Sequence, residues 1–289
     1  MNRLVLGTAQ FGLAYGIANR EGQVPRVTAK AMLQLAAAGG IDTLDTAVTY
    51  GESETCLGEL GTQGFRLITK IPAVPDGCAD VSGWMEQQVT ESLARLGART
   101  LFGLLLHRPG QLLEGNGNEL FQTLLNLKKD KRVKKVGISI YSPDELEKLI
   151  PRYHFDLVQA PFSLIDRRLY LNGWLGRLKE EGVEVHTRSS FLQGLLLMPR
   201  ESIPSNFSRW SGLWGKWHAW LERHDSSALE ACLGFPFSFP EIDHVVVGAD
   251  NVRQLEQIIQ AATGGYPGDL PDLRCDDEDL INPTRWRSS

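Results

Sequence analysis

The sequence predicts an α/β protein folded as a (β/α)8 barrel of the TIM type, and three observations support this. Short apolar segments alternate with longer amphipathic ones along the whole chain. Most short segments are rich in Val, Ile and Leu without strict alternation, which is typical of parallel strands buried on both faces. The length of 289 residues is usual for one barrel. We expect a single domain, 1–289, whose turn-rich, acidic end (263–289) lies over or around the barrel.

Eight segments are expected to form the strands of this barrel. They are 4–9, 41–47, 66–71, 101–107, 134–140, 156–162, 183–189 and 244–248. A doubly wound open sheet is the main alternative. The first strand is followed by GTAQFG, which lacks the glycine spacing of a dinucleotide fingerprint and leads into a loop rather than a helix. The barrel is therefore favoured.

Helix signals fill the intervals between these strands. Apolar residues in 82–97 recur at helical spacing. The segment Ser142-Pro143-Asp144-Glu145 has the residues of a capping box, with proline at the first helical position. Gly182 is expected to end a helix over 166–181. The tryptophan-rich segment 207–220 has two open interpretations, helix packing or an aromatic wall facing a substrate.

Composition limits the partners of the chain. A net charge of -5 argues against nucleic-acid binding, for which a basic surface is expected. No apolar run approaches the roughly 18 residues of a membrane-spanning helix. The four cysteines form no CxxC pair, which indicates reduced thiols and a cytoplasmic location. His218 and His224 lack partners at metal-ligand spacing, so we expect no metal site. The oligomeric state is left open.

Polar side chains stand at the ends of three consecutive strands. Asp45 and Tyr50 follow the second strand, Lys70 ends the third and His107 the fourth. Each alone has a structural explanation, as a cap, a solvent-facing residue or a packing residue. Strand C-termini meet at one face of a barrel, where barrel enzymes carry their active sites. Four such residues on this face indicate a common site, with Asp45 and Lys70 paired.

This set of side chains suits proton transfer to a carbonyl oxygen. A tyrosine has a pKa near 10, and a lysine ammonium beside it is expected to lower that pKa. The carboxylate holds the lysine in place, and the tyrosine then acts as general acid or base. A neutral histidine donates a hydrogen bond that orients the carbonyl. The sequence therefore predicts hydride addition to a carbonyl, or its reverse.

Six ordered segments resemble motifs of the aldo-keto reductase family. They are DTAVTYGESE, ITK, LLLHRP, VGISIYSPDEL, VQAPFSLIDR and VVVGADNVRQLEQ. The resemblance covers nearly the whole chain and implies a barrel oxidoreductase that uses NADPH or NADH, with NADP preferred in the family. Its substrate would be a small aldehyde, ketone or sugar. It implies that Tyr50 is the proton donor, that Lys70 and Asp45 tune it, and that His107 orients the carbonyl.

The resemblance also implies a set of cofactor-binding positions at the strand ends. They are Gly7, Thr8, Ala9, Asp45, Ser139, Gln159, Arg188, Ser189, Phe191, Gly194, Gly248, Ala249, Asp250, Asn251, Gln254 and Gln257.

The sequence departs from the family pattern in three places. Ile140 stands where Asn usually follows Ser139. Arg188 stands where an aromatic residue often stacks on the nicotinamide; a guanidinium can also stack, and would add affinity for an anionic group. Gly248, Ala249 and Asp250 replace the usual contacts to the 2′-phosphate, which weakens the expected preference for NADPH and admits NADH.

Two other functions stay open at this point. One is a regulatory barrel that binds nucleotide with little turnover, although the presence of all four residues argues against it. The other is an aldolase-like lyase with Lys70 as Schiff-base nucleophile. Asp45 beside Lys70 would keep the amine protonated, which argues against this lyase.

Overall fold

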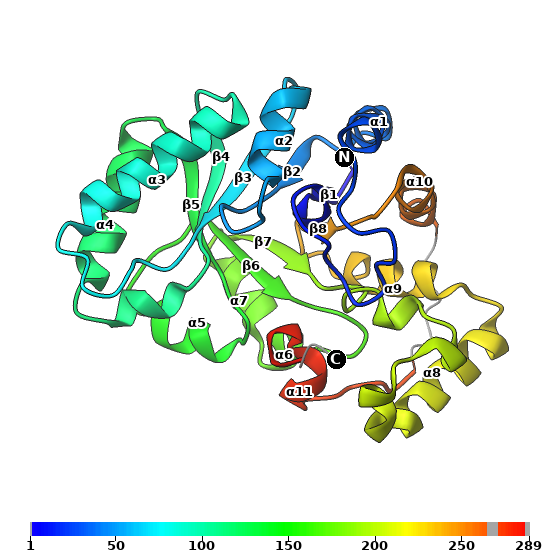
Figure 1. Ribbon diagram of the computed structural model, residues 1–289. Coiled ribbons are helices and arrows are strands. Elements are labelled where there is room, and N and C mark those ends of the chain that lie inside the picture. The colour runs from blue at the N-terminus through cyan, green and yellow to red at the C-terminus, as the bar shows by residue number, and fades with distance from the viewer. Residues whose placement is uncertain (1, 265–270, 287–289) are drawn as a thin grey trace.

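The computed structural model describes residues 2–264 and 271–286. Its eight parallel strands close into a barrel in chain order, with β1 paired to β8 (Figure 1). The predicted (β/α)8 barrel is confirmed, and every strand ends within two residues of its predicted bounds. The strands are β1 Leu4–Gly7, β2 Thr43–Asp45, β3 Arg66–Ile71, β4 Leu101–Leu106, β5 Val133–Ser139, β6 Leu157–Pro161, β7 Glu184–Arg188 and β8 His244–Val247.

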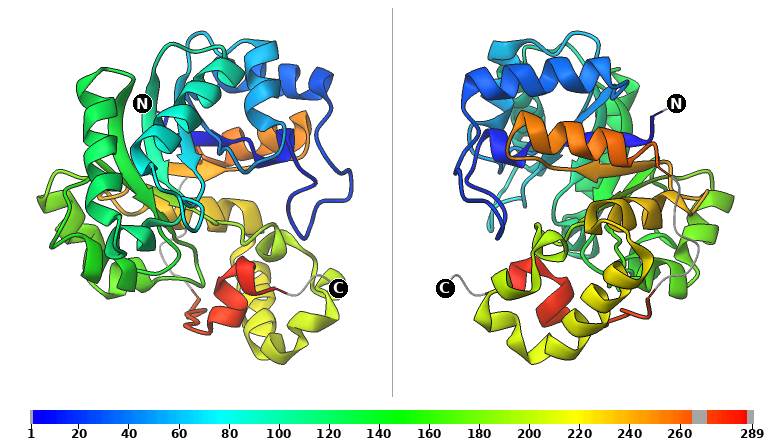
Figure 2. Two further views of the ribbon diagram at one scale, coloured as in Figure 1. Left: turned by 60° about the vertical axis from the view of Figure 1, so that its left-hand side comes forward. Right: turned by 90° about the vertical axis from the view of Figure 1, so that its right-hand side faces the viewer.

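Helices surround the barrel, and α1 and α10 lie side by side against β1 and β8 (Figures 1 and 2). Two helices, α8 and α9, occupy the interval between β7 and β8. The helices are α1 Arg26–Ala38, α2 Ser53–Leu60, α3 Val81–Leu96, α4 Gly117–Lys129, α5 Asp144–Leu149, α6 Arg168–Leu171, α7 Trp174–Glu180, α8 Ser211–His224, α9 Ala228–Phe237, α10 Val252–Ala261 and α11 Glu278–Ile281.

The helix predictions hold in part. The 82–97 segment forms α3, but the single helix over 166–181 is wrong. It divides into α6 and α7 at Gly173, whose φ of 74° lies in the left-handed region and interrupts the helix. Gly182 does stand beyond α7, with φ 72°. At α5, Glu145 accepts hydrogen bonds from the amides of Tyr141 and Ser142, which is one half of the expected capping box.

The tryptophan-rich segment packs inside the protein. Trp214, Trp217 and Trp220 of α8 are buried, and the last two stack with centroids 5.9 Å apart. This burial supports helix packing rather than a wall facing substrate. No helix in the described part of the chain is long and apolar enough to cross a membrane.

The described part of the C-terminal stretch lies against the segment that follows β6. The amide of Cys275 donates to the carbonyl of Ile165, and Arg168 of α6 pairs with Glu278 of α11 at 3.0 Å. The remainder of the predicted tail, 265–270 and 287–289, lies outside the described residues.

Candidate active site

The structure brings Asp45 and Lys70 together at the C-terminal ends of β2 and β3. Lys70 Nζ lies 2.5 Å from Asp45 Oδ2, and both side chains are buried. The ammonium also donates to the carbonyl oxygen of Thr46 at 2.9 Å. The other oxygen of Asp45 accepts from Gln159 Nε2 at 2.7 Å. The predicted ion pair is therefore present, and hydrogen bonds fix both partners.

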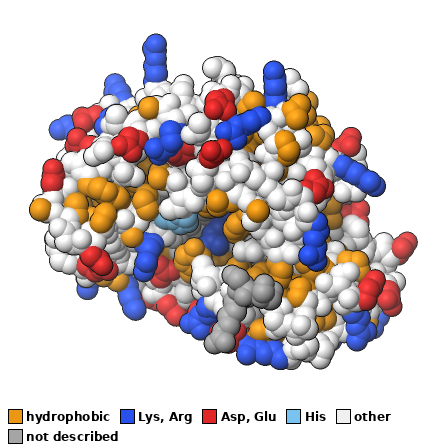
Figure 3. All heavy atoms as spheres, viewed as in Figure 1, with side chains coloured by type: hydrophobic (Ala, Val, Ile, Leu, Met, Phe, Trp, Pro, Cys, Tyr) orange, Lys and Arg blue, Asp and Glu red, His pale blue; other side chains and the backbone are white. Residues whose placement is uncertain are grey.

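Tyr50 and His107 lie above this pair. Lys70 Nζ is 5.1 Å from the centroid of the Tyr50 ring. The rings of Tyr50 and His107 meet edge to face, with centroids 6.0 Å apart. Thr49 Oγ1 lies 3.3 Å from His107 Nδ1. In the space-filling view, a histidine and a basic side chain lie in the hollow of this face (Figure 3).

Two glycines determine where the Tyr50 loop runs. A Cβ at Gly12 would lie 1.8 Å from the carbonyl oxygen of Tyr50, and one at Gly51 would lie 2.4 Å from the carbonyl oxygen of Gly12. Gly51 also has φ 55°, in the left-handed region. The loop after β1 and the loop after β2 thus pack backbone against backbone. This close approach fixes the position from which the Tyr50 side chain enters the mouth.

Ser53 has a different role from the one its position suggests. It does not cap α2; its hydroxyl donates to the carbonyl and hydroxyl oxygens of Thr8, at 2.8 and 2.9 Å. Thr46 Oγ1 also lies 3.0 Å from it. Thr8, one of the predicted cofactor-binding residues, is therefore held by the loop that carries Tyr50.

The prediction that Lys70 lowers the pKa of Tyr50 is wrong for this structure. Burial raises the pKa of Tyr50 above its usual value, and the charge of Asp45 raises it further. The Lys70 ammonium donates hydrogen bonds to Asp45 and to the carbonyl oxygen of Thr46, and none to the phenol. The guanidinium of Arg188 acts in the opposite direction and lowers the pKa of Tyr50.

The other two ionisable groups are also shifted by burial. Burial and the nearby charges of Lys70 and Arg188 lower the pKa of His107 to about 4, so its imidazole is neutral at pH 7. Burial lowers the pKa of Lys70, while the charge and hydrogen bond of Asp45 raise it. A neutral histidine, a protonated phenol and a paired lysine are therefore the species present at the mouth.

The predicted cofactor positions divide into three groups around the mouth, at the ends of β1, β2 and β5 to β8. The first group continues from Asp45: Gln159 donates to Asp45, and Ser139 Oγ donates to Gln159 Oε1 at 3.3 Å. Gly7 at the end of β1 is paired in register with Asp45. Thr8 donates through its amide and its hydroxyl to the carbonyl oxygen of Asp45. Ala9 follows it, buried in a 3-10 turn.

The second group follows β7. Arg188 stacks its guanidinium 4.7 Å from the Tyr141 ring centroid and donates to Ile140 O and Ser189 Oγ. Phe191 is partly buried, and Gly194 has φ 88° and abuts Ala18 of the first loop. Ser190 was not among the predicted residues, yet its buried hydroxyl lies in this group and has no hydrogen-bond partner among the described residues. An orphaned hydroxyl here fits a polar ligand.

The third group follows β8 and begins α10. Asn251 caps α10 by accepting from the amide of Gln254, and the amide of Asp250 donates to Gln254 Oε1. The loop after β1 reaches this group, since Asn19 donates to Asp250 and Asn251 donates to Glu21. Gly248 and Ala249 lead into this turn. Gln257 lies on the exposed side of α10, beyond these contacts.

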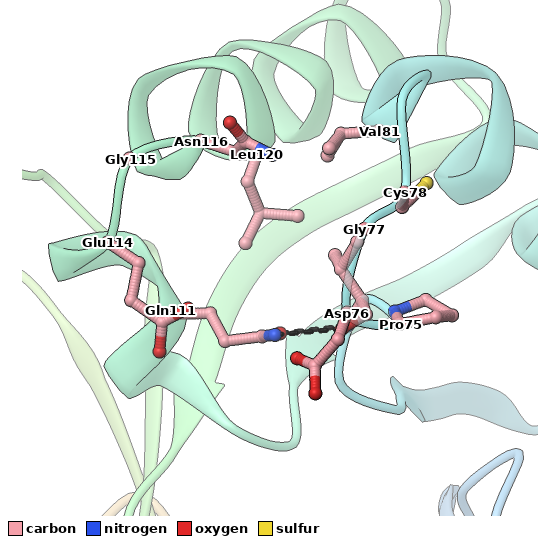
Figure 4. Close-up of a pocket in the computed structure, with 11 residues that line it drawn as sticks. Pro75, Asp76, Gly77, Cys78, Val81, Gln111, Glu114, Gly115, Asn116 and Leu120 are labelled. Carbon is pink, nitrogen blue, oxygen red and sulfur yellow. Dashed lines mark hydrogen bonds between the residues drawn. The ribbon is translucent and has the colours of Figure 1, made fainter.

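Two adjoining cavities open beside the loops that follow β3, β4 and β5. One, of about 250 Å³, is lined by His107, Arg108, Pro109, Gly110, Gln111, Glu114, Tyr141 and Glu145. The other, of about 190 Å³, lies between the loops after β3 and β4 (Figure 4). Gln111 borders both and bonds to the amide and the carbonyl of Val74, at 2.8 and 2.9 Å. The first cavity adjoins a candidate catalytic residue and is the better substrate site.

A second polar cluster lies at the opposite end of the barrel. Glu184 and His244 are the first residues of β7 and β8, and with His186 they place possible metal ligands within 4.8 Å of one another. Spacing along the chain did not reveal this cluster. The Glu184 carboxylate already contacts His186 and the ammonium of Lys135. Burial opposes ionisation, yet these hydrogen bonds lower the pKa of Glu184 to about 2.

Comparisons with known proteins agree with the barrel fold. The model of the aldo/keto reductase family matches residues 3–264. An uncharacterised oxidoreductase of Bacillus subtilis, YqkF, is 26% identical over 243 residues, which cover 77% of this chain and 78% of that protein. The holo form of an aldo-keto reductase from Bacillus halodurans superposes with a TM-score of 0.74 at 20% identity, over 91% of this chain and 87% of that one. A putative aldo-keto reductase from Pseudomonas aeruginosa gives 0.67 at 20% identity, over 90% and 89%.

Proposed function

Because the chain belongs to the aldo/keto reductase family, whose members are oxidoreductases of carbonyl compounds, we propose that it reduces a small aldehyde, ketone or sugar to an alcohol, or catalyses the reverse, with Tyr50 as the proton donor. The observation that carries this proposal is the buried Lys70–Asp45 pair beneath Tyr50, with His107 edge-on to the same ring. The proposed proton donor Tyr50, the Lys70–Asp45 ion pair and the neutral hydrogen-bond donor His107 therefore lie around one hollow.

Each residue has a distinct task in this reaction. NADH or NADPH, when bound, supplies the hydride. The raised pKa of Tyr50 keeps its phenol protonated, which is the form that gives a proton to the developing alkoxide. His107, neutral because burial lowers its pKa to about 4, donates a hydrogen bond to the carbonyl oxygen. The Lys70–Asp45 pair holds the floor of the site in one arrangement.

The residues at the ends of β5 to β8 fit a nicotinamide nucleotide. Ser139, Gln159 and the unpaired hydroxyl of Ser190 would meet the nicotinamide end. The first amides of α10 would meet phosphate oxygens, because the N-terminus of a helix presents unpaired N–H groups.

Two carboxylates at the β8 loop favour NADH over NADPH. Asp250 and Glu21 are both held there, by contacts with Asn19 and Asn251. A 2′-phosphate placed beside them would meet like charges, whereas a ribose hydroxyl can donate to a carboxylate. We therefore propose NADH as the cofactor used at least as well as NADPH.

The Schiff-base alternative has one observation in its favour, the lowered pKa of Lys70. The side chain of Lys70 is fully buried, however, and its ammonium is engaged by Asp45 and Thr46. A substrate carbonyl has no access to that nitrogen. Borohydride in the presence of carbonyl substrates should therefore trap no adduct on Lys70.

Replacing Tyr50 by Phe tests the proposed function. We expect carbonyl reduction, followed by loss of nucleotide absorbance, to fall by roughly two to four orders of magnitude, because the general acid is lost. Nucleotide binding, followed by tryptophan fluorescence, should stay close to that of the wild type. Lys70→Met should slow the same step. Unchanged turnover in Tyr50→Phe would refute the assignment of Tyr50.

A further inference from the structure

Arg188 is a partly buried cation without a carboxylate partner. Its guanidinium donates to the carbonyl of Ile140 at 2.9 Å and to the hydroxyl of Ser189 at 3.2 Å. One face is covered by the ring of Tyr141, 4.7 Å away. Within residues 2–264 and 271–286 it forms no ion pair. Two neutral acceptors leave three of the five guanidinium N–H groups of an arginine free.

Partial burial of a cation without a charged partner costs free energy, which an anionic ligand would offset. A charged group taken out of water loses hydration, and neutral acceptors restore only part of that loss. The buried carboxylate of Asp45 is already paired with Lys70. Nothing in the described protein therefore competes for the free edge of Arg188.

Arg188 lies near the proposed reaction centre, since it is the last residue of β7, at the same end of the barrel, and stacks on Tyr141. The charge of Arg188 lowers the pKa values of Tyr50, Lys70 and His107, so all three lie within its field. Tyr141, on which Arg188 stacks, also lines the 250 Å³ cavity together with His107. A molecule held in this cavity would contact His107 and Tyr141, the ring on which the guanidinium stacks.

Acidic groups nearby are directed elsewhere. Glu145 borders the cavity, but one of its oxygens accepts from the amides of Tyr141 and Ser142. Glu114 lies on the far side, next to Gln111. Neither carboxylate forms an ion pair with Arg188 among the described residues, and Arg108 adds a cation to the lining of the same cavity.

We propose that Arg188 is an anion-binding residue of the substrate site, and that the preferred substrates are small carbonyl compounds carrying a carboxylate or phosphate. This inference rests on the proposed carbonyl reduction. A guanidinium suits either group because its parallel N–H donors match two oxygens at once. The stack on Tyr141 and the hydrogen bond to the carbonyl of Ile140 hold the guanidinium of Arg188 in place before a substrate binds.

Matched substrate pairs test this inference. Succinic semialdehyde is compared with butanal, 4-carboxybenzaldehyde with benzaldehyde, and glyceraldehyde 3-phosphate with glyceraldehyde. In the wild type, kcat/KM should favour the charged member of at least one pair, and the pair that shows it identifies carboxylate or phosphate. In Arg188→Met that ratio should fall by roughly 10- to 100-fold, the effect of losing a charge-assisted hydrogen bond. Arg188→Lys should restore part of the ratio.

Arg177→Met is the matched control. Arg177 also stacks on an aromatic ring, that of Trp174 at 3.8 Å, but it lies on α7 outside the mouth. Its substitution should leave the ratio unchanged. An equal loss on charged and neutral substrates in Arg188→Met, or a loss of nucleotide affinity without a change in ratio, would assign Arg188 to the chemistry or the cofactor and overturn the inference. A wild type without preference would overturn it too.

A binding measurement separates this inference from the proposed function. Calorimetric titration with benzoate and with benzamide needs no turnover. Benzoate should bind the wild type more tightly than benzamide does, and Arg188→Met should abolish the difference. If no carbonyl compound is reduced but this difference is present, the proposed function fails while the anion site stands. If reduction occurs but the difference is absent, the anion site fails alone.

Discussion

At the scale of single residues, the site is defined less by which side chains are present than by which charges are already paired. Lys70 is neutralised by Asp45, so it does not act on Tyr50 as an isolated cation. Arg188 has no such partner in the described chain, so its charge reaches the whole mouth. In the loop after β8, the carboxylates of Asp250 and Glu21 place negative charge beside the N-terminus of α10.

Replacing Asp250 by Ser should shift nucleotide use toward NADPH. Burial raises the pKa of Asp250, and its carboxylate, when ionised, repels a 2′-phosphate. We expect the ratio of kcat/KM for NADPH to that for NADH to rise by roughly tenfold, since one like-charge contact is worth about 1.4 kcal/mol at such a site. Glu256→Gln, at an exposed position of α10, is the control of equal charge and should leave the ratio unchanged. A constant ratio in Asp250→Ser would exclude this role.

At the scale of elements, the strands could be predicted because each buried parallel strand carries its own apolar signal. The break between α6 and α7 could not, because Gly173 resembles the tolerated glycines of other helices until its positive φ is known. The Asp45–Lys70 pair was predictable from strand ends alone. The stack of Arg188 on Tyr141 depends on how the ends of β5 and β7 lie across β6, and the raised pKa of Tyr50 depends on burial, which sequence spacing does not contain.

The contact between the loops after β1 and β2 makes Gly12 a sensitive position. In Gly12→Ala the new methyl group would overlap the carbonyl oxygen of Tyr50, so the Tyr50 loop must move. We expect a loss of stability of about 1–3 kcal/mol, measured by urea unfolding, and a fall in kcat/KM of at least tenfold. Gly176→Ala is the control, because Gly176 is exposed in α7 with open space around it. It should be neutral or slightly stabilising. Wild-type activity in Gly12→Ala would show that this contact does not position Tyr50.

At the scale of the whole molecule, the two ends of the barrel each hold a partly buried, neutral histidine. Burial lowers the pKa of His107 at the mouth to about 4. At the opposite end, burial and the neighbouring His186 lower the pKa of His244 to about 4 as well. In the unfolded chain both return to an ordinary value near 6.5. Between about pH 4 and pH 6.5, the two imidazoles therefore bind protons in the unfolded chain but not in the folded protein.

This difference predicts acid sensitivity between pH 6.5 and pH 4. Because the folded pKa values are depressed, the unfolded state binds more protons in this window, and the free energy of unfolding falls as pH decreases. The stabilising contribution is complete above pH 6.5 and lost by pH 4, and it amounts to about 2 kcal/mol for each histidine after allowance for partial exposure. Urea unfolding at pH 7.5 and pH 4.5 measures the loss. His107→Gln should lose about 2 kcal/mol less than the wild type over this range, whereas exposed His154→Gln should follow the wild type. If His107→Gln and the wild type lose the same stability, the imidazole of His107 is not held neutral by the fold, and its proposed role as a neutral hydrogen-bond donor to the carbonyl fails with it.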